Sequence, residues 1–407
     1  MKLLWLLFAG IYLTSCSYTE KASNQYQQED VTKYVDLNLS GTHNKSFFFT
    51  PAVIPFGLVK LAPHTNAFGS NDSLISVGYS NKHTSIEGFG HFHELQIGGL
   101  VVMPTTGKLV TLPGSLDNPD SGYRSRFNKE EQIATTGYYA VNLKDYNIKA
   151  ELTATEHVGF HRYTFPASSK AHILLDIGHK QKESSEMINA CAKMVSDTEV
   201  EGFIETYPDY SKFSNPEKHV KMFFAARFNK APKVVGCYDD ISYTPGINRT
   251  GGTENGLVFT FPTKEGERIE LQVSLSSTST DNAWNNIKVE TNELSFDEAR
   301  IKAKSAWQNV LSKIKISGGT EEDKIRFYTG LYYALLGKGI LPETNELIMS
   351  NENIDQIPID KKNLIKEYIK EGLRNELRNI SYFFNHNPSE YLYDNIQLIT
   401  QINKETG

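Results

Sequence analysis

The pattern of apolar and polar residues divides the chain into a long strand-rich part and a shorter helical part. Between residues 34 and 280, short runs alternate apolar and polar side chains, and turn-forming residues separate these runs. Ile148, Ala150 and Leu152 alternate with polar residues, and the run Ile269–Leu275 repeats the pattern. Because no helical pattern intervenes, we predict a mostly β fold, a large antiparallel β-sandwich over residues 34–280, with a loop at Tyr243–Gly256.

The period changes after Asp281, where helices are predicted. Ser295–Glu298 has the form of a capping box, and apolar residues then recur at three- and four-residue intervals as far as Leu311. This pattern predicts a linker helix within residues 281–319. A second box at Thr320–Asp323 opens another helix that runs to Leu336, and an amphipathic third helix is predicted within residues 364–380. We therefore expect a few α-helices, the start of a helical domain over residues 320–407.

The N-terminus has the features of an export signal. Lys2 precedes the apolar run Leu3–Leu13, which is too short to span a bilayer, and small residues then lead to Cys16. We predict a bacterial lipoprotein signal peptide over residues 1–16, a lipid on Cys16, and a flexible polar tether over residues 17–33. The chain would then be exported and lipid-anchored in the cell envelope, facing the periplasm or the cell surface. An ordinary secretory signal peptide is the alternative.

Composition narrows the class of partner. A net charge of -6 and a pI near 6.0 show no basic excess, so a nucleic-acid partner is not expected. The 21 Tyr and 22 Phe residues suit strands and also suit platforms that stack against sugars. Besides Cys16, only Cys191 and Cys237 remain, and a disulfide and two buried thiols are both open.

The densest group of chemically active side chains lies between residues 78 and 104. Three histidines and two glutamates occur there among several glycines: His83, His91, His93, Glu87 and Glu94. Imidazole and carboxylate groups can bind hydroxyls, protons or metals, but the same residues could form a plain turn with structural histidines. A metal-dependent hydrolase site on this loop is a further alternative. Since neither a cysteine pair nor a helical His-Glu-x-x-His motif is present, no metal ligands are assigned.

Ten short segments in one order resemble the amino-terminal half of glycoside hydrolase family 92, the bacterial exo-acting α-mannosidases. The resemblance covers residues 34–358, and nothing familiar follows Lys361. In chain order the segments are Tyr34–Asp36, Gly41–Thr42, Pro51–Pro63, Gly78–Tyr79, Gly88–His93, Met103–Pro104, Gly122–Phe127, Gly137–Val141, Glu151–Thr155 and Arg162–Pro166.

This resemblance implies a β-sandwich followed by an (α/α)6 barrel, with the active site at their junction. The family inverts configuration at the α-mannosidic bond with an acid and a base, and it uses calcium to hold and distort the terminal mannose. A mannose-containing glycan is therefore the expected ligand. The candidate substrate-binding residues are Gly88, His91, His93, Glu94 and Glu343, and the weaker candidates are Asn66, Phe68 and Tyr79.

The sequence also departs from the family. Family members usually have serine at the position of Gly90 and aspartate at the position of Glu343. The family's catalytic glutamate and aspartate lie beyond the first barrel helices. No catalytic residue is assigned here. We therefore expect an α-mannosidase-like hydrolase of N-glycan or mannan degradation that is truncated and catalytically incomplete, unless a second polypeptide supplies the barrel. The alternatives are a non-catalytic carbohydrate-binding lipoprotein and an inactive gene fragment.

Overall fold

The computed structural model describes residues 29–38, 49–66, 78–92, 98–179, 186–207, 219–239, 242–292 and 294–336. The signal peptide with Cys16, the candidate residues Phe68, His93, Glu94 and Glu343, and the helix predicted within residues 364–380 lie outside these ranges. Predictions for those residues stay predictions.

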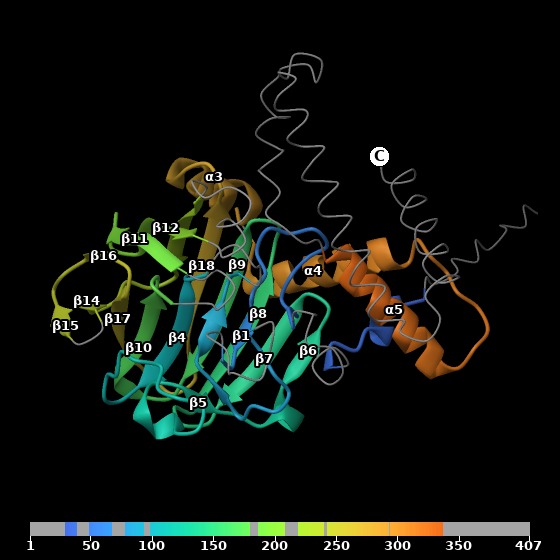
Figure 1. Ribbon diagram of the computed structural model, residues 1–407, viewed down its shortest axis with the longest axis horizontal. Coiled ribbons are helices and arrows are strands. Elements are labelled where there is room, and N and C mark those ends of the chain that lie inside the picture. Colours follow the sequence, from blue (N-terminus) through green and yellow to red (C-terminus); the bar gives the residue numbers. More distant parts are fainter. Residues whose placement is uncertain are drawn as a thin grey trace, which may run out of the picture.

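Two antiparallel sheets form a sandwich (Figure 1). The seven-stranded sheet has the order β1 (Ala62–His64), β3 (Gly88–Gly90), β4 (Val101–Thr106), β10 (Ser168–Asp176), β17 (Asn255–Thr263), β14 (Val234–Asp239) and β15 (Tyr243–Pro245). The nine-stranded sheet has the order β16 (Arg249–Gly252), β11 (Glu186–Met194), β12 (Glu199–Tyr207), β13 (Val220–Phe228), β18 (Glu267–Ser276), β9 (Val158–Phe165), β8 (Ile148–Ala154), β7 (Tyr138–Leu143) and β6 (Ile133–Thr135). Strands β2 (Ser85–Ile86) and β5 (Ser125–Arg126) pair separately.

Aromatic side chains from both sheets fill the space between them. Phe228 of β13 contacts Phe259 of β17 with ring centroids 4.7 Å apart, and Phe89 of β3 contacts Tyr163 of β9 at 6.0 Å. Strand β12 alternates buried and half-buried residues along its whole length. The predicted antiparallel sandwich is therefore confirmed, and it arises because one face of each strand is apolar.

Three α-helices follow the sandwich in the part of the chain that the structure describes: α3 (Thr280–Glu290), α4 (Phe296–Leu311) and α5 (Glu321–Leu335). Both predicted capping boxes are present, at Ser295 with Glu298 and at Thr320 with Asp323. Figure 1 shows α4 and α5 together beside the β6–β9 end of the sandwich, with α3 at the end of β12 and β18. The short 3-10 helices are η1 (Val31–Tyr34), η2 (Pro119–Ser121) and η3 (Lys129–Glu131).

Helices α3 and α4 cover part of the outer face of the nine-stranded sheet. A second apolar cluster there includes Tyr138 and Phe160 from the sheet, Ile287 from α3 and Phe296 from α4. Gly137 permits the close approach of α4, since a Cβ atom at this position would lie 2.6 Å from the Cβ atom of Ala303. This second layer explains why β8 is buried on both faces instead of only the predicted one.

Two boundaries differ from the sequence prediction. The segment predicted as a loop at Tyr243–Gly256 contains β15, β16 and the start of β17, because its threonines and glycines pair at the sheet edges. Helix η1 begins at Val31, which lies inside the predicted tether and is buried. Of the two outcomes left open for Cys191 and Cys237, the structure has free thiols, which are half-buried and lie on different sheets.

Candidate functional site at the sandwich–helix junction

The first helices are joined to the sandwich by a buried aromatic pair. Trp307 of α4 and Tyr332 of α5 are fully buried, with ring centroids 4.1 Å apart. The indole N–H of Trp307 donates to the Val53 carbonyl at 2.6 Å, and the Tyr332 hydroxyl donates to the Thr50 carbonyl at 2.7 Å. These bonds satisfy buried carbonyl groups of an irregular segment and fix both helices against it.

A buried lysine fixes the end of α5. The Lys60 ammonium donates to the Gly57 carbonyl at 2.6 Å and to the Leu336 carbonyl at 2.7 Å, and its side chain is almost fully inaccessible. The Phe56 N–H donates to the Leu335 carbonyl at 3.2 Å. A cation at a helix C-terminus interacts favourably with the negative end of the helix dipole. The position at which the chain leaves α5 is therefore set by the sandwich.

Polar and charged side chains attach the N-terminal turn of α4 to the sheet. Arg162 of β9 makes two 3.1 Å bonds to the Glu151 carboxylate of β8 and one 3.0 Å bond to Asp297 of α4. The guanidinium also lies over the Phe296 ring, and the Tyr138 hydroxyl donates to Glu151 at 2.7 Å. Although burial opposes ionisation, hydrogen bonds from Arg162 and Tyr138 lower the pKa of Glu151 to about 2.

Comparisons with known proteins decide the family. The model of the glycosyl hydrolase family 92 N-terminal domain matches residues 34–276, and the model of the family's catalytic domain matches residues 282–407. The chain belongs to glycosyl hydrolase family 92. The catalytic-domain match includes α4 and α5 and continues to residue 407. The similarity to the family therefore extends beyond residue 358, where the sequence-based expectation ended it.

Several family 92 proteins are similar to this chain. An α-mannosidase from Bacteroides thetaiotaomicron, solved in complex with mannoimidazole, is 29% identical with a TM-score of 0.67, over 75% of this chain and 40% of its own. The family 92 hydrolase ccman5 is 25% identical with a TM-score of 0.62, over 75% and 41%. An uncharacterized secreted glycosidase from Arthroderma benhamiae is 26% identical over 86% of this chain and 46% of its own. The chain thus spans less than half the length of these relatives.

Of the family-derived candidates, His91 lies in the sandwich core. Its Nδ1 atom donates to the Leu100 carbonyl at 2.7 Å, and its Nε2 atom lies 2.9 Å from Nε2 of His161, whose Nδ1 atom lies 2.7 Å from the Tyr163 hydroxyl. All three side chains are fully buried. Both ring nitrogens of His91 are therefore occupied inside the protein, which favours the structural alternative over a sugar contact.

The other described candidates also have structural contacts. Tyr79 is buried, stacks on Phe49 at 4.1 Å between centroids and bonds to Gln132. Gly88 lies in β3 with a φ of 150°, and a Cβ atom there would come within 2.3 Å of Val101. Asn66 is half-buried, and its N–H donates to the Gly78 carbonyl. Tyr79 and Gly88 therefore have structural roles in the sandwich, and a sugar-binding role for either stays a prediction.

A buried polar cluster that the sequence did not predict lies on the seven-stranded sheet. His64, Glu87 and His179 bring one ligand atom each within 4.8 Å of one another. Burial lowers the pKa of His179, but interactions with Asp176 and Glu87 outweigh it and raise the pKa to about 10. Of the three residues, Glu87 alone lies in the stretch of residues 78–104 that the sequence singled out. The sequence pattern therefore pointed to one carboxylate of this cluster and to neither of its histidines.

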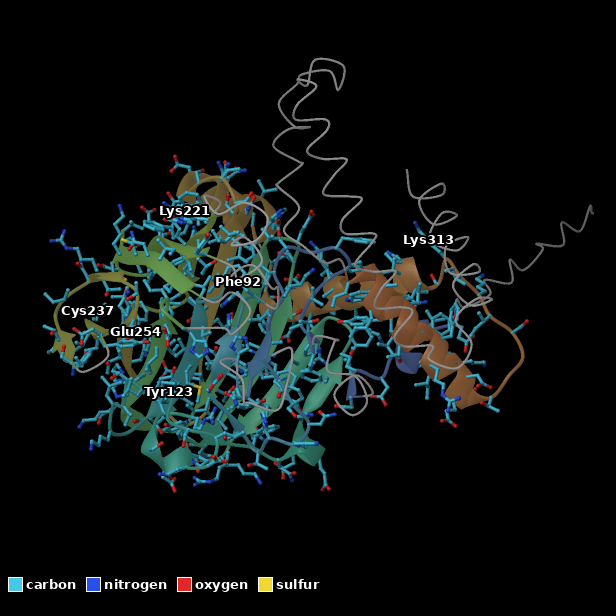
Figure 2. All side chains as sticks on the ribbon, in the orientation of Figure 1. Phe92, Tyr123, Lys221, Cys237, Glu254 and Lys313 are labelled. Carbon is cyan, nitrogen blue, oxygen red and sulfur yellow. The ribbon has the colours of Figure 1, made fainter. Side chains whose placement is uncertain are left out.

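A separate cavity lies at the edge of the sandwich formed by β14 to β17. It has a volume of about 440 Å³ and is lined by polar and glycine residues, including Cys237, Glu254 and Asn255. Figure 2 shows Cys237 and Glu254 at the opposite side of the molecule from Lys313, which follows α4. This cavity is therefore remote from the junction.

The buried His91–His161 pair predicts a loss of stability in mild acid. Burial lowers the pKa of His91 to about 4 and also lowers that of His161. Because the unfolded chain binds protons near the ordinary pKa of 6.5 and the folded chain does not, stability falls as the pH drops from 6.5 towards 4. For His91 alone, the free energy of unfolding should fall by about 2 kcal/mol between pH 7 and pH 5.

Urea unfolding at pH 7 and pH 5 measures this fall in the free energy of unfolding. In His91→Gln the fall should be smaller by the part that His91 contributes. An unchanged pH dependence in His91→Gln would show that the pair does not titrate as inferred.

Proposed function

We propose that this chain is part of an exported family 92 α-mannosidase that removes terminal mannose from N-glycans or mannan. The proposal rests on the contacts at the junction between the sandwich and the first helices. Trp307, Tyr332 and Lys60 bind the first helices of the catalytic-domain segment to the family's N-terminal sandwich through buried hydrogen bonds. A similar protein was solved with mannoimidazole bound, which supports a mannose-containing ligand. In this proposal the sandwich positions the barrel that completes the sugar site.

The described residues do not provide a matched acid and base for this reaction. An inverting glycosidase needs an acid with a raised pKa and a second carboxylate far enough away to activate water. Glu270 has a raised pKa, caused by burial, but it faces the Arg162 cluster under α4. We therefore propose that the acid and base belong to the part of the barrel that the longer relatives have and residues 1–407 do not cover, and that residues 1–407 alone bind glycan without hydrolysing it.

The family's calcium does not fit the described junction. Calcium takes six to eight oxygen ligands, but the Gly57 and Leu336 carbonyl groups at the junction face the Lys60 ammonium, whose positive charge would repel the ion. No step is therefore assigned to calcium here.

Export and lipid attachment at Cys16 complete the proposal. The relative from Arthroderma benhamiae is described as secreted, which supports export. No helix in the described ranges is long and apolar enough to cross a membrane. Incorporation of labelled palmitate should be lost in Cys16→Ala, whereas retained labelling would contradict lipidation at this cysteine.

An assay on an aryl α-mannoside tests the proposal that residues 1–407 bind glycan and that the remaining barrel supplies the acid and base. With calcium present, the purified 407-residue chain should release no aryl alcohol, because the acid and base together supply the chemical step. A longer product that includes the family's remaining barrel should release it. Turnover by the 407-residue chain would overturn the proposal that the acid and base lie outside residues 1–407. An inactive longer product that still gives binding heat with mannobiose in calorimetry would instead support the non-catalytic carbohydrate-binding alternative.

A further inference from the structure

We propose that His64, Glu87 and His179 form a zinc site inside the sandwich. The three side chains come from the end of β1, the connection between β2 and β3, and the residues after β10. They are 1%, 5% and 8% exposed. Two imidazoles and one carboxylate are a ligand set that binds zinc with a fourth position left for water.

The distances suit ligands of one ion better than hydrogen-bonded partners. His179 Nε2 lies 3.6 Å from Glu87 Oε1 and makes no hydrogen bond in the described structure. Two ligands at about 2.0–2.1 Å from a tetrahedral zinc ion lie roughly 3.4 Å apart. The His179–Glu87 pair is therefore close to that spacing, and an ion would need to draw the three ligand atoms together from their 4.8 Å spread.

The surrounding groups orient the proposed ligands. Asp176 Oδ2 lies 3.6 Å from Nδ1 of His179, on the side of the ring away from Glu87, and the Tyr123 hydroxyl donates to the same Asp176 oxygen at 3.4 Å. A carboxylate behind a metal-bound histidine is a recurring arrangement in zinc sites. Arg124 donates to Oε2 of Glu87 at 2.8 Å, so Oε1 faces His179.

Gly90 provides the space that the His64 ring occupies. A Cβ atom on Gly90 would lie 2.3 Å from Cε1 and Nε2 of His64, which is a distance that forces the ring to move. The absence of a side chain at Gly90 therefore leaves room for the His64 ring. This contact supplies a way to disturb one ligand without removing it.

The donor atoms favour zinc over calcium. Calcium binds oxygen almost exclusively, whereas two of the three ligands here are imidazole nitrogens. Glu87, Asp176 and Arg124 carry a summed charge of −1, which a divalent ion more than balances. A doubly protonated His179 between the two carboxylates would also balance this charge. NMR detection of the protons on the His179 nitrogens distinguishes that state from a bound ion. A bound ion would link three segments that are far apart in the sequence and would stabilise the fold.

Metal titration of the full chain tests the site. After removal of metals with a chelator, the protein should bind one equivalent of Zn²⁺, and Co²⁺ should give the intense visible absorption of a tetrahedral N/O site. Zn²⁺ at 100-fold excess over its dissociation constant should raise the Tm by a few degrees. Absence of both stoichiometric Zn²⁺ binding and a Co²⁺ spectrum would overturn the proposal. NMR signals from protons on both His179 nitrogens with Zn²⁺ present would also overturn it.

Substitutions identify the ligands. His179→Gln and Glu87→Gln should each lose the bound equivalent, and Asp176→Asn should weaken binding by about 10- to 100-fold. Gly90→Ser should weaken Zn²⁺ binding through displacement of His64. His172→Gln is the matched control, because His172 lies on the same strand as Asp176 but contacts Thr260 and Gly107 instead. Equal Zn²⁺ binding by His172→Gln and the ligand variants would place the metal elsewhere and refute the assignment.

Discussion

Replacement of Trp307 with alanine is expected to lower the free energy of unfolding by about 4 kcal/mol. Trp307 is fully buried where α4, α5 and the segment around Val53 meet, and its indole stacks on Tyr332. The substitution removes the largest buried side chain at the junction and leaves the Val53 carbonyl without its indole donor. Chemical unfolding followed by circular dichroism measures the loss.

Trp307→Phe separates the ring from its hydrogen bond. Phenylalanine keeps most of the apolar contact with Tyr332 but cannot donate to Val53, so the expected loss is about 1–2 kcal/mol. Trp284→Phe is a useful comparison, since Trp284 is only partly buried and donates to Glu201. If Trp307→Ala cost less than 1 kcal/mol, α4 and α5 would not be an integral part of the sandwich, and the proposed role of the junction would fail.

The elements that could be predicted from the sequence are those specified by local pattern. The capping boxes at Ser295 and Thr320 mark the starts of α4 and α5, because the cap and its glutamate or aspartate are three residues apart in the chain. The alternation of Ile148, Ala150 and Leu152 likewise identifies β8, since one apolar row is enough to place a strand on a core.

What could not be predicted depends on contacts between distant segments. His64 and His179 meet only because β1 and β10 both lie in the seven-stranded sheet, and no spacing in the sequence records that arrangement. His91 is as compatible with a sugar contact as with a buried partner until His161 is placed beside it. The short strands β15 and β16 were missed because edge pairing holds residues whose composition is typical of loops.

The second large effect is expected from Glu151→Gln, which should lower the free energy of unfolding by about 3 kcal/mol at pH 7. Glutamine has the size of glutamate but no charge, and its amide NH₂ group would face the Arg162 guanidinium. Arg162 would then keep its bond to Asp297, whose side chain is largely exposed and screened by solvent. The cost comes mostly from a buried cation left without its close partner, because the two bonds to Glu151 are shielded from water.

The pH dependence gives this prediction a distinct signature. The folded-state pKa of Glu151 is lowered to about 2, so its contribution is fully present above its ordinary pKa of 4.5 and is lost as the pH falls towards 2. The difference in stability between the parent chain and Glu151→Gln should therefore narrow below pH 4.5. A difference that stayed constant down to pH 3 would show that the substitution acts through packing and not through charge.

A double substitution tests whether the ion pair itself is needed. Glu151→Leu with Arg162→Met removes both charges and retains apolar volume beneath Phe296, so it should cost much less than Glu151→Gln alone. Urea unfolding of the two variants beside the parent chain makes the comparison. If the double variant were as unstable as Glu151→Gln, the Arg162 pair would be required to hold α4 on the sheet. If it were restored towards the parent value, the apolar cluster of Phe296, Tyr138 and Ile287 would be sufficient to attach the helix.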